Sequence, residues 1–287
     1  MKIYDCFTFY NEHTLLELRL AELYNHVDHF VIVESNQTFT NNTKPWNFDI
    51  AKYSQYADKI IYVQVEDMPN SSNPWDNEHH QRNAITRGLV DANDNDIVIV
   101  SDVDEILRPQ AVDYLRTSEQ MVFALRMPLY NFKFNYMRSS PGQYDCWAMA
   151  ARASVFRTLL PNSLRELRHS FHQTPFQFVN DGCETVEHAG WHFGYFGDRA
   201  HLIDKAQNFS HQEVNRPDFI EQIDIDASIQ AGTSWARYNT NEHYAVVAMD
   251  SYMPQTVVQN QERYQDYILA NPTTTALAIV PEYTYNT

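Results

Sequence analysis

Three carboxylates stand close together behind an apolar run, in the segment DIVIVSDVDEIL at residues 96–107. The run Ile97–Val100 leads into Asp102, Asp104 and Glu105. Negative charges this close repel one another unless a positive charge lies among them. In an extended segment, residues i and i+2 point the same way, so Asp102 and Asp104 can face one ion. Oxygen ligands of this kind favour Mn²⁺ or Mg²⁺, which also binds phosphate oxygens.

The elements that must position these acids alternate between strand and helix along the first hundred residues. The predicted strands are residues 2–10, 29–35, 58–66 and 96–106, and the predicted helices are residues 12–27 and 77–93. Such alternation predicts an α/β fold with a central, mostly parallel sheet flanked by helices, in which ligands bind beyond the carboxyl ends of the strands. Three strands end in polar residues, at Asn11–Glu12, Glu34–Ser35 and Asp102–Asp104, so these side chains are expected at one edge of the sheet.

The chain beyond about residue 120 is rich in aromatic residues and less regular, which favours mixed or antiparallel strands followed by helices. Residues 254–272 predict a C-terminal helix that stops at Asn271–Pro272. Four of the seven glycines fall within residues 182–197, where we expect the backbone to turn sharply or to approach another part of the molecule closely. No low-complexity linker interrupts the chain, so we predict one domain with two halves, residues 1–120 carrying the D-x-D motif and residues 121–287.

Composition narrows the classes of function. The 287-residue chain carries a formal net charge of −16, which argues against a nucleic-acid partner. Neither G-x-G-x-x-G nor G-x-x-x-x-G-K-[ST] occurs, which excludes the dinucleotide-binding and P-loop classes. The N-terminus lacks a long apolar segment and no run of eighteen apolar residues occurs, so we expect no membrane span and a cytoplasmic location. The three cysteines are too scattered for a disulfide framework or a C-x-x-C metal site.

Several blocks of the sequence resemble a known family. The sequences YNE, QRNAI and the apolar strand before D-x-D resemble the nucleotide-sugar half of GT-A glycosyltransferases. The longer blocks are LLELRLAELYNHVDHFVIVESNQTFTNNTKP, SDVDEI, LYNFKFN, HAGWHFGYFGD and LIDKAQNFSHQE. These look like glycosyltransferase family 17, the family of the β-1,4-mannosyl-glycoprotein N-acetylglucosaminyltransferases, over about residues 4–270.

The resemblance implies roles for residues in the first half. Asp102 and Asp104 would hold Mn²⁺ or Mg²⁺ against the diphosphate of a UDP-sugar. The residues expected around the nucleotide are Asn11, Glu12, Glu34 and Arg82, with Lys205 pairing with the diphosphate. The alternatives are a solvated loop for the D-x-D segment, a strand-end loop acid for Glu34, a surface salt bridge for Arg82 and a solvated side chain for Lys205.

The second half would bind the acceptor. Trp191 and Tyr195 offer flat faces for sugar stacking, and core packing is the alternative for both. His192 and His211 are each candidates for a third metal ligand, and we expect the glycine-rich turn around Trp191 to close over the donor phosphates. An inverting displacement also needs a carboxylate as general base. Our first choice is Glu187, and the other candidates are Asp145, Asp181, Glu184 and Glu213.

We therefore predict a metal-dependent, inverting glycosyltransferase that moves GlcNAc from UDP-GlcNAc to a hydroxyl of a glycan acceptor. The alternatives are a carbohydrate-binding protein without turnover and a D-x-D phosphatase of the haloacid-dehalogenase type. In that phosphatase class the first Asp is a nucleophile near the start of the domain, whereas here the motif follows three predicted strands.

Overall fold

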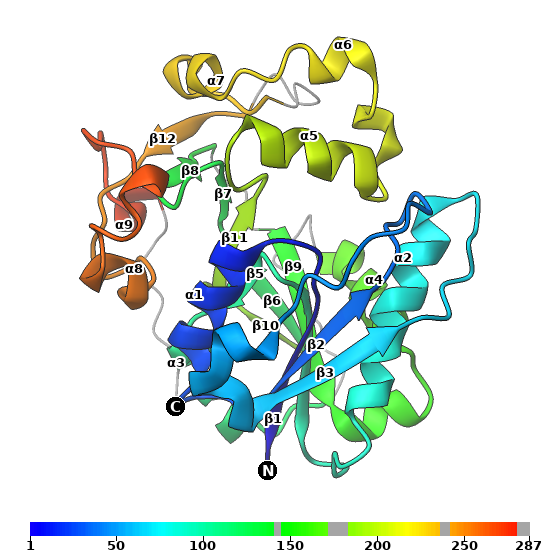
Figure 1. The fold of residues 1–287 in the computed structure, drawn as a ribbon. Coiled ribbons are helices and arrows are strands. Elements are labelled where there is room, and N and C mark those ends of the chain that lie inside the picture. Colours follow the sequence, from blue (N-terminus) through cyan, green and yellow to red (C-terminus); the bar gives the residue numbers. More distant parts are fainter. Residues whose placement is uncertain (141–144, 172–182, 236–241, 280–287) are drawn as a thin grey trace.

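The chain folds around two β-sheets, seen in a computed structural model that describes residues 1–140, 145–171, 183–235 and 242–279 (Figure 1). The larger sheet has seven strands in the order β10-β6-β9-β4-β1-β2-β3. Its strands are β1 (Ile3–Thr8), β2 (His29–Ser35), β3 (Ile60–Val65), β4 (Ile97–Asp102), β6 (Val122–Met127), β9 (Asp145–Arg152) and β10 (Cys183–Val186). Strand β9 runs antiparallel to β4 and β6, and the other neighbouring pairs are parallel. The predicted α/β fold with a mostly parallel central sheet is confirmed.

The strand order reverses beside β1. Strands β2 and β3 extend the sheet on one side of β1, whereas β4 lies on its other side. Thr8, the last residue of β1, lies opposite Asp102, the last residue of β4. In sheets of this kind, the crevice between such strands is where ligands bind.

A second, five-stranded sheet has the order β12-β8-β7-β11-β5. Its strands are β5 (Glu105–Leu107), β7 (Leu129–Asn131), β8 (Tyr136–Arg138), β11 (Gly190–Gly194) and β12 (Tyr244–Val246). Strand β11 pairs antiparallel with β5, in a register that sets His192 opposite Glu105. The turn expected around Trp191 is wrong at this position, because Gly190 to Gly194 form a strand, whereas the close approach expected as the alternative is found at Gly190. A Cβ at Gly190 would lie 2.1 Å from the carbonyl oxygen of Ile106, so the glycine permits a close approach of β11 to β5.

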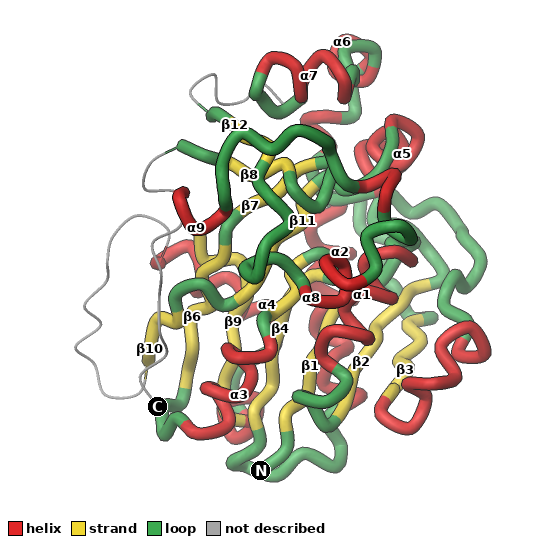
Figure 2. Tube along the Cα trace, turned by 90° about the vertical axis from the view of Figure 1, so that its left-hand side faces the viewer, coloured by secondary structure: helices red, strands yellow, loops and turns green. Residues whose placement is uncertain are grey.

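Helices cover both faces of the larger sheet, and the side chains of its strands alternate between two apolar clusters (Figures 1 and 2). The α-helices are α1 (His13–Leu23), α2 (Pro74–Asn83), α3 (Pro109–Thr117), α4 (Pro161–Glu166), α5 (Arg199–Asn208), α6 (Pro217–Ile220), α7 (Ile225–Ala231), α8 (Gln255–Gln259) and α9 (Ala276–Ile279). The 3₁₀ helices are η1 (Ile50–Lys59), η2 (Ala84–Gly88), η3 (Ala153–Arg157), η4 (Leu167–Phe171), η5 (Gln212–Val214) and η6 (Gln265–Tyr267). Apolar residues of α1 and α3 cover one face of the sheet, and those of η2 and α4 cover the other.

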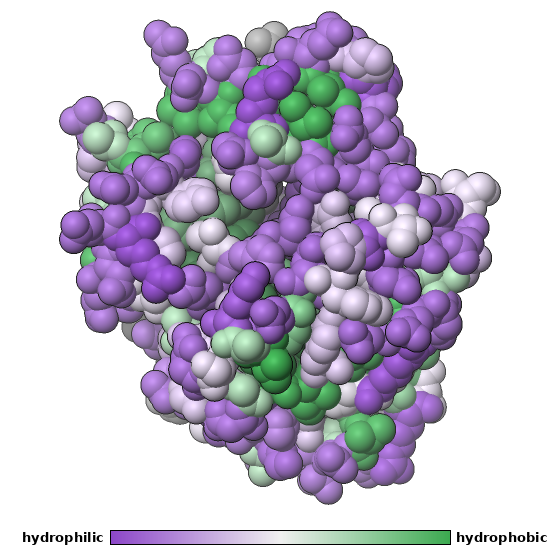
Figure 3. Space-filling view, viewed as in Figure 1, coloured by the Kyte–Doolittle hydropathy of each residue, from purple (hydrophilic) through white to green (hydrophobic). Residues whose placement is uncertain are grey.

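The outer surface agrees with the composition. The face shown in Figure 3 is mostly hydrophilic, with apolar residues gathered near its top, where α6 and α7 lie, and in the middle of its lower half. Among the residues that the structure describes, no helix combines the length and the apolar character needed to cross a membrane.

Two helix predictions differ from the structure. The helix expected at residues 77–93 begins earlier, because Asn73 caps α2 and Pro74 starts it, and it continues as the 3₁₀ helix η2. The long C-terminal helix expected at 254–272 is wrong. Helix α8 ends at Gln259, because Asn260 leaves helical geometry at φ −127° and its side chain donates to the carbonyl oxygen of Thr256 at 2.7 Å.

One guanidinium lies at the junction of β1, α1 and the turn after β4. Arg19 is fully buried and forms an ion pair with Asp5, with Nε donating to Oδ2 at 2.7 Å. The same guanidinium donates to Ser101 Oγ at 2.6 Å and to the carbonyl oxygens of Asp102 and Glu105 at 2.8 and 3.0 Å. Arg19 therefore holds the backbone that carries the three acids.

Replacing this guanidinium should destabilise the fold. Arg19→Met should lower the free energy of unfolding by about 3–5 kcal/mol, because Asp5 would stay buried without its counter-charge. Urea unfolding measures the change. The matched control is Arg263→Met, since Arg263 is 61% exposed and pairs with Glu17 at the surface, where a loss below about 1 kcal/mol is expected. Similar losses in both variants would contradict the assigned role of Arg19.

Candidate active site

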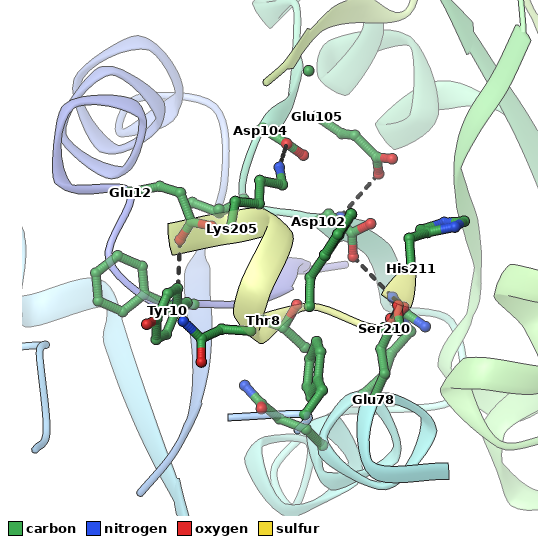
Figure 4. Close-up of a pocket in the computed structure, with 18 of the residues that line it drawn as sticks. Thr8, Tyr10, Glu12, Glu78, Asp102, Asp104, Glu105, Lys205, Ser210 and His211 are labelled. Carbon is green, nitrogen blue, oxygen red and sulfur yellow. Dashed lines mark hydrogen bonds and ion pairs between the residues drawn. The ribbon is translucent and has the colours of Figure 1, made fainter. Parts of the chain in front are cut away.

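A cavity of about 450 Å³ opens at the carboxyl ends of β1 and β4. Its wall includes Thr8–Tyr10 from the end of β1 and Asp102–Glu105 from the end of β4, together with residues of α2, β11 and α5 (Figure 4). The cavity therefore lies where the strand order reverses, the position expected for a ligand in this type of sheet.

The first acid of the D-x-D motif is held by two arginines. Asp102 accepts from Arg82 through Oδ1 and from Arg165 through Oδ2, each at 3.0 Å. Burial alone would raise the pKa of Asp102, but the positive charges of Arg165, Arg82 and Arg168 outweigh it and hold this pKa well below its usual range. The protein itself thus supplies the positive charge that this carboxylate requires.

The second acid faces a lysine and a histidine. Asp104 is buried, and its Oδ2 accepts from Lys205 Nζ at 2.9 Å (Figure 4). Its Oδ1 lies 3.8 Å from His192 Nε2. Burial opposes the charge of Lys205, but Asp104 and Glu12 outweigh it and raise the pKa of the lysine. Lys205 therefore stays positive beside Asp104.

The third acid, Glu105, has the least exposed side chain of the three. Glu105 is 1% exposed and accepts from Arg165 at 2.5 Å and from the backbone amide of Asp102 at 2.9 Å. Burial, together with the charges of Asp102 and Asp104, raises the pKa of Glu105 to about 7 against the lowering effect of Arg165. Its carboxyl group is thus poised between its charged and neutral forms near neutral pH.

Asp104, Glu105 and His192 form a cluster with one potential ligand atom each within 4.8 Å of the others. Burial first, and the charges of Lys205 and Arg165 after it, lower the pKa of His192 to about 4, so the imidazole is neutral. Its Nδ1 is buried without a hydrogen-bond partner among the described residues. Two carboxylates and a neutral imidazole are a donor set that suits Mn²⁺, so these residues fit the metal expected from the sequence. Asp102, whose two oxygens face arginines, lies outside the cluster.

The structure brings several of the predicted site residues to the cavity. Those on its wall are Glu12, Arg82, Asp102, Asp104, His192, Tyr195, Lys205 and His211. His211 is about half exposed, pairs with Glu213 at 2.6 Å and lies outside the acid and imidazole cluster. Arg82 is buried rather than on the surface, and its charge is shared between Glu78 and Asp102.

Other predicted residues lie elsewhere. Asn11 donates to Asp204 Oδ2 at 2.8 Å and lines a smaller neighbouring cavity. Glu34 is fully buried outside the main cavity, where its carboxylate accepts from Lys44 Nζ at 2.5 Å and from Tyr62 Oη at 2.8 Å. Trp191 is 2% exposed and donates to the carbonyl oxygen of Tyr252 at 3.0 Å, so its indole packs in the core. A core position leaves no open ring face for a sugar.

The candidates for the general base that the structure describes do not line the main cavity. Glu187 pairs with Arg126 at 2.6 Å, and Asp145 pairs with Arg138 at 2.6 Å. Glu184 accepts from Ser118 Oγ at 3.2 Å. Asp181 lies outside the described residues. None of the described members of this set lines the main cavity.

Sequence reasoning gave no role to several residues on the wall, among them Glu78, Asn131, Trp147, Arg165 and Arg168. Glu78 lies one turn before Arg82 on α2, a spacing that could have indicated their ion pair. Asn131 belongs to the block LYNFKFN, to which no role was given. No local pattern marks Arg165 and Arg168, which reach the acids only through the tertiary fold.

The curated relatives share one name. The human protein named β-1,4-mannosyl-glycoprotein 4-β-N-acetylglucosaminyltransferase is 28% identical over 136 residues, which cover 42% of this chain and 26% of that protein. The mouse protein of the same name is 26% identical over 293 residues, which cover 91% of this chain and 53% of that protein. This chain thus spans about half the length of the mouse relative and about a quarter of the human one.

Solved structures overlap with the fold only loosely. A galactosyltransferase, LgtC, in complex with donor and acceptor sugar analogues matches with a TM-score of 0.34 and 11% identity, over 65% of this chain and 73% of that one. The 2-C-methyl-D-erythritol 4-phosphate cytidylyltransferase of Francisella tularensis matches with a TM-score of 0.30 and 11% identity, over 65% of this chain and 90% of that one. Overlaps this low carry no argument about function.

The family match covers nearly all of the fold. The family model for glycosyltransferase family 17 matches residues 1–271, which include both sheets and the whole wall of the cavity. The family resemblance noted in the sequence is confirmed, and the chain belongs to glycosyltransferase family 17.

Proposed function

We propose that the chain is a metal-dependent, inverting glycosyltransferase of the GT-A type that transfers GlcNAc from UDP-GlcNAc to a hydroxyl of a glycan. The observation that carries the proposal is the cluster of Asp104, Glu105 and His192 on the wall of a large cavity, at the reversal of strand order, in a chain of this family. The shared name of the curated relatives supports GlcNAc as the sugar.

The metal would be held by Asp104, Glu105 and His192. Once bound, Mn²⁺ or Mg²⁺ would supply positive charge to the diphosphate of the donor as the UDP leaves. Lys205, whose Nζ lies 2.9 Å from Asp104 Oδ2, is a second positive charge at the same place. Asp102 is not a metal ligand in this proposal. Its carboxylate holds the side chains of Arg82 and Arg165 in place.

Arg168 offers a further contact for phosphate. It lines the cavity, and its Nη1 is buried without a hydrogen-bond partner among the described residues. Burial and the neighbouring charge of Arg165 lower the pKa of Arg168, so this guanidinium gains from an added anion. Phosphate oxygens of a nucleotide sugar match that requirement, since guanidinium groups bind them in a fixed geometry.

The acceptor hydroxyl must lose a proton to a carboxylate in an inverting transfer. A smaller cavity of about 110 Å³ adjoins the first, and Glu12, Asp104 and Lys205 line both. Of the two acids that line both cavities, Asp104 belongs to the proposed metal cluster, so we assign the general base to Glu12. One of its oxygens accepts from the backbone amides of Tyr10 and Asn11, which fixes the carboxylate between the two cavities. In this proposal Glu12 replaces Glu187 as the first candidate.

Donor binding tests the proposal as a whole. UDP-GlcNAc should raise the melting temperature only when Mn²⁺ or Mg²⁺ is present, because the ion would link the cluster of Asp104, Glu105 and His192 to the oxygens of the diphosphate. A panel of nucleotide sugars in a thermal-shift assay, each with Mn²⁺ and with EDTA, measures this. Stabilisation by GDP-mannose and not by UDP compounds would contradict the donor. Slow hydrolysis of UDP-GlcNAc would separate a transferase from a carbohydrate-binding protein, and rapid turnover of p-nitrophenyl phosphate would indicate a phosphatase.

Metal titrations test the cluster. Asp104→Asn should lower turnover by roughly 100-fold or more, because the ion that stabilises the leaving group loses a ligand. His192→Ala should raise the Mn²⁺ concentration for half-maximal activity by roughly tenfold or more. His211→Ala is the matched control, since His211 lies on the same wall outside the cluster, and its titration midpoint should stay that of the wild type. The cluster is misassigned if the His211 variant shifts the midpoint and the His192 variant does not.

The base is tested by separating binding from turnover. Glu12→Gln keeps the size of the side chain and removes its ability to take a proton, so turnover should fall by roughly 100-fold or more. The dissociation constant for UDP-GlcNAc, measured by calorimetry with Mn²⁺, should stay within about threefold of the wild type. Glu187→Gln serves as the control and should retain most turnover, because Glu187 pairs with Arg126 away from both cavities. Full turnover by Glu12→Gln would exclude it as the base.

A further inference from the structure

The cavity wall contains a buried hydrogen-bond acceptor that the proposed function does not yet use. Asn131, the last residue of β7, is 2% exposed and lines the cavity. Its Oδ1 has no hydrogen-bond partner among the residues that the structure describes. A buried amide oxygen without a partner has lost its hydrogen bonds to water and gained none in return, which is unfavourable. A ligand that donates an O–H or N–H at this point would restore one of them.

The hydrogen bonds behind Asn131 fix the direction of its amide. Its Nδ2 lies 2.9 Å from Tyr244 Oη and 3.1 Å from Ser234 Oγ. The hydroxyl of Tyr244 donates its single hydrogen to Glu242 Oε2 at 3.2 Å, so toward Asn131 it can only accept. Burial and the charge of Glu242 raise the pKa of Tyr244, which keeps this hydrogen in place. The NH₂ group of Asn131 must therefore face Tyr244, and Oδ1 must face the other way.

Oδ1 faces Gly194, the last residue of β11, which also lines the cavity. A Cβ on Gly194 would lie 3.2 Å from Asn131 Oδ1, 3.6 Å from His192 Nε2 and 3.0 Å from Leu129 Cδ1. The glycine thus keeps open the space between the free acceptor and the imidazole of the proposed metal cluster. Any side chain at this position would enter that space.

The geometry points to the subsite of the transferred sugar, an inference that rests on the proposed function. We infer that Asn131 Oδ1 accepts a hydrogen bond from a hydroxyl or amide N–H of this sugar, and that Gly194 admits the ring. His192 belongs to the cluster that would face the diphosphate, and the sugar of a UDP-sugar is bonded directly to that diphosphate. A group beside His192 therefore meets the sugar rather than the uridine. Trp147, with its ring centroid 4.2 Å from that of His192, gives this end of the cavity an aromatic wall.

The test compares the affinity for UDP with that for UDP-sugars, in the presence of Mn²⁺, by calorimetry. Gly194→Ala and Asn131→Ala should each leave the dissociation constant for UDP within about twofold of the wild type. Each should raise the dissociation constant for UDP-GlcNAc by roughly fivefold to tenfold, the loss expected for one hydrogen bond. Gly194→Ala leaves the contacts of Asn131 to Ser234 and Tyr244 in place, so it carries the test if Asn131→Ala folds poorly.

UDP-glucose lacks the acetamido group, so it shows whether a ring hydroxyl or the amide N–H of the sugar donates the hydrogen bond to Asn131. Equal losses for UDP-glucose and UDP-GlcNAc assign a ring hydroxyl to Asn131, and a loss confined to UDP-GlcNAc assigns the amide N–H.

Asn135 provides a matched control from the same block of sequence. It is 1% exposed, its Nδ2 donates to the carbonyl oxygens of Val247 and Leu269, and its Oδ1 accepts from the backbone amide of Leu269. Asn135→Ala should lower the melting temperature while the ratio of the two dissociation constants stays unchanged. An unchanged ratio in the Asn131 and Gly194 variants, or a rise in acceptor KM alone, would overturn the sugar subsite. Failure of the wild type to bind UDP at all would instead overturn the proposed function, and this inference with it.

Discussion

The buried pair of Arg19 and Asp5 is the constraint on which the site depends. A guanidinium without solvent must satisfy its donors inside the protein, and Arg19 does so on a carboxylate of β1 and on the backbone after β4. Because these acceptors include the carbonyl oxygens of Asp102 and Glu105, the turn that carries the acids is fixed by main-chain contacts. Arg19 thereby joins β1, at Asp5, to the turn after β4, and it leaves the acid side chains to other partners.

Around this anchor, the protein balances most of the negative charge with its own cations. Arg82 and Arg165 face Asp102, Arg165 also faces Glu105, and Lys205 faces Asp104. This arrangement places a positive charge beside each of the three acids in one turn, which offsets the cost of burying them so close together. It also separates the two aspartates of the D-x-D motif, because the arginines engage both oxygens of the first.

The sequence predicted four of the seven strands of the larger sheet, β1 to β4, and β1, β2 and β4 are buried on both faces. A continuous apolar run such as Ile97–Val100 predicts a strand covered on both faces, and all four residues are buried. The prediction of a long C-terminal helix was wrong because it rested on the spacing of apolar residues alone. It took no account of Asn260, whose side chain hydrogen-bonds to the backbone at Thr256. Arg165 carries no local signal, since its role arises only when α4 packs beside β4. For Trp191 the sequence left sugar stacking and core packing both open, because residue type and spacing alone do not separate a sugar platform from a core residue.

The second sheet shows why sequence reasoning could name His192 only as one of two candidate ligands and could not place it beside the acids. His192 reaches Glu105 only through the antiparallel register of β11 on β5, which joins segments far apart in the chain. That register depends on the close approach at Gly190, where a side chain would strike the backbone of Ile106. The same strand then runs parallel to β7 and sets Gly194 beside Asn131. One short strand therefore carries both an imidazole for the acid cluster and the open space next to the free amide oxygen, so a shift of its register by one residue would turn both away from the cavity.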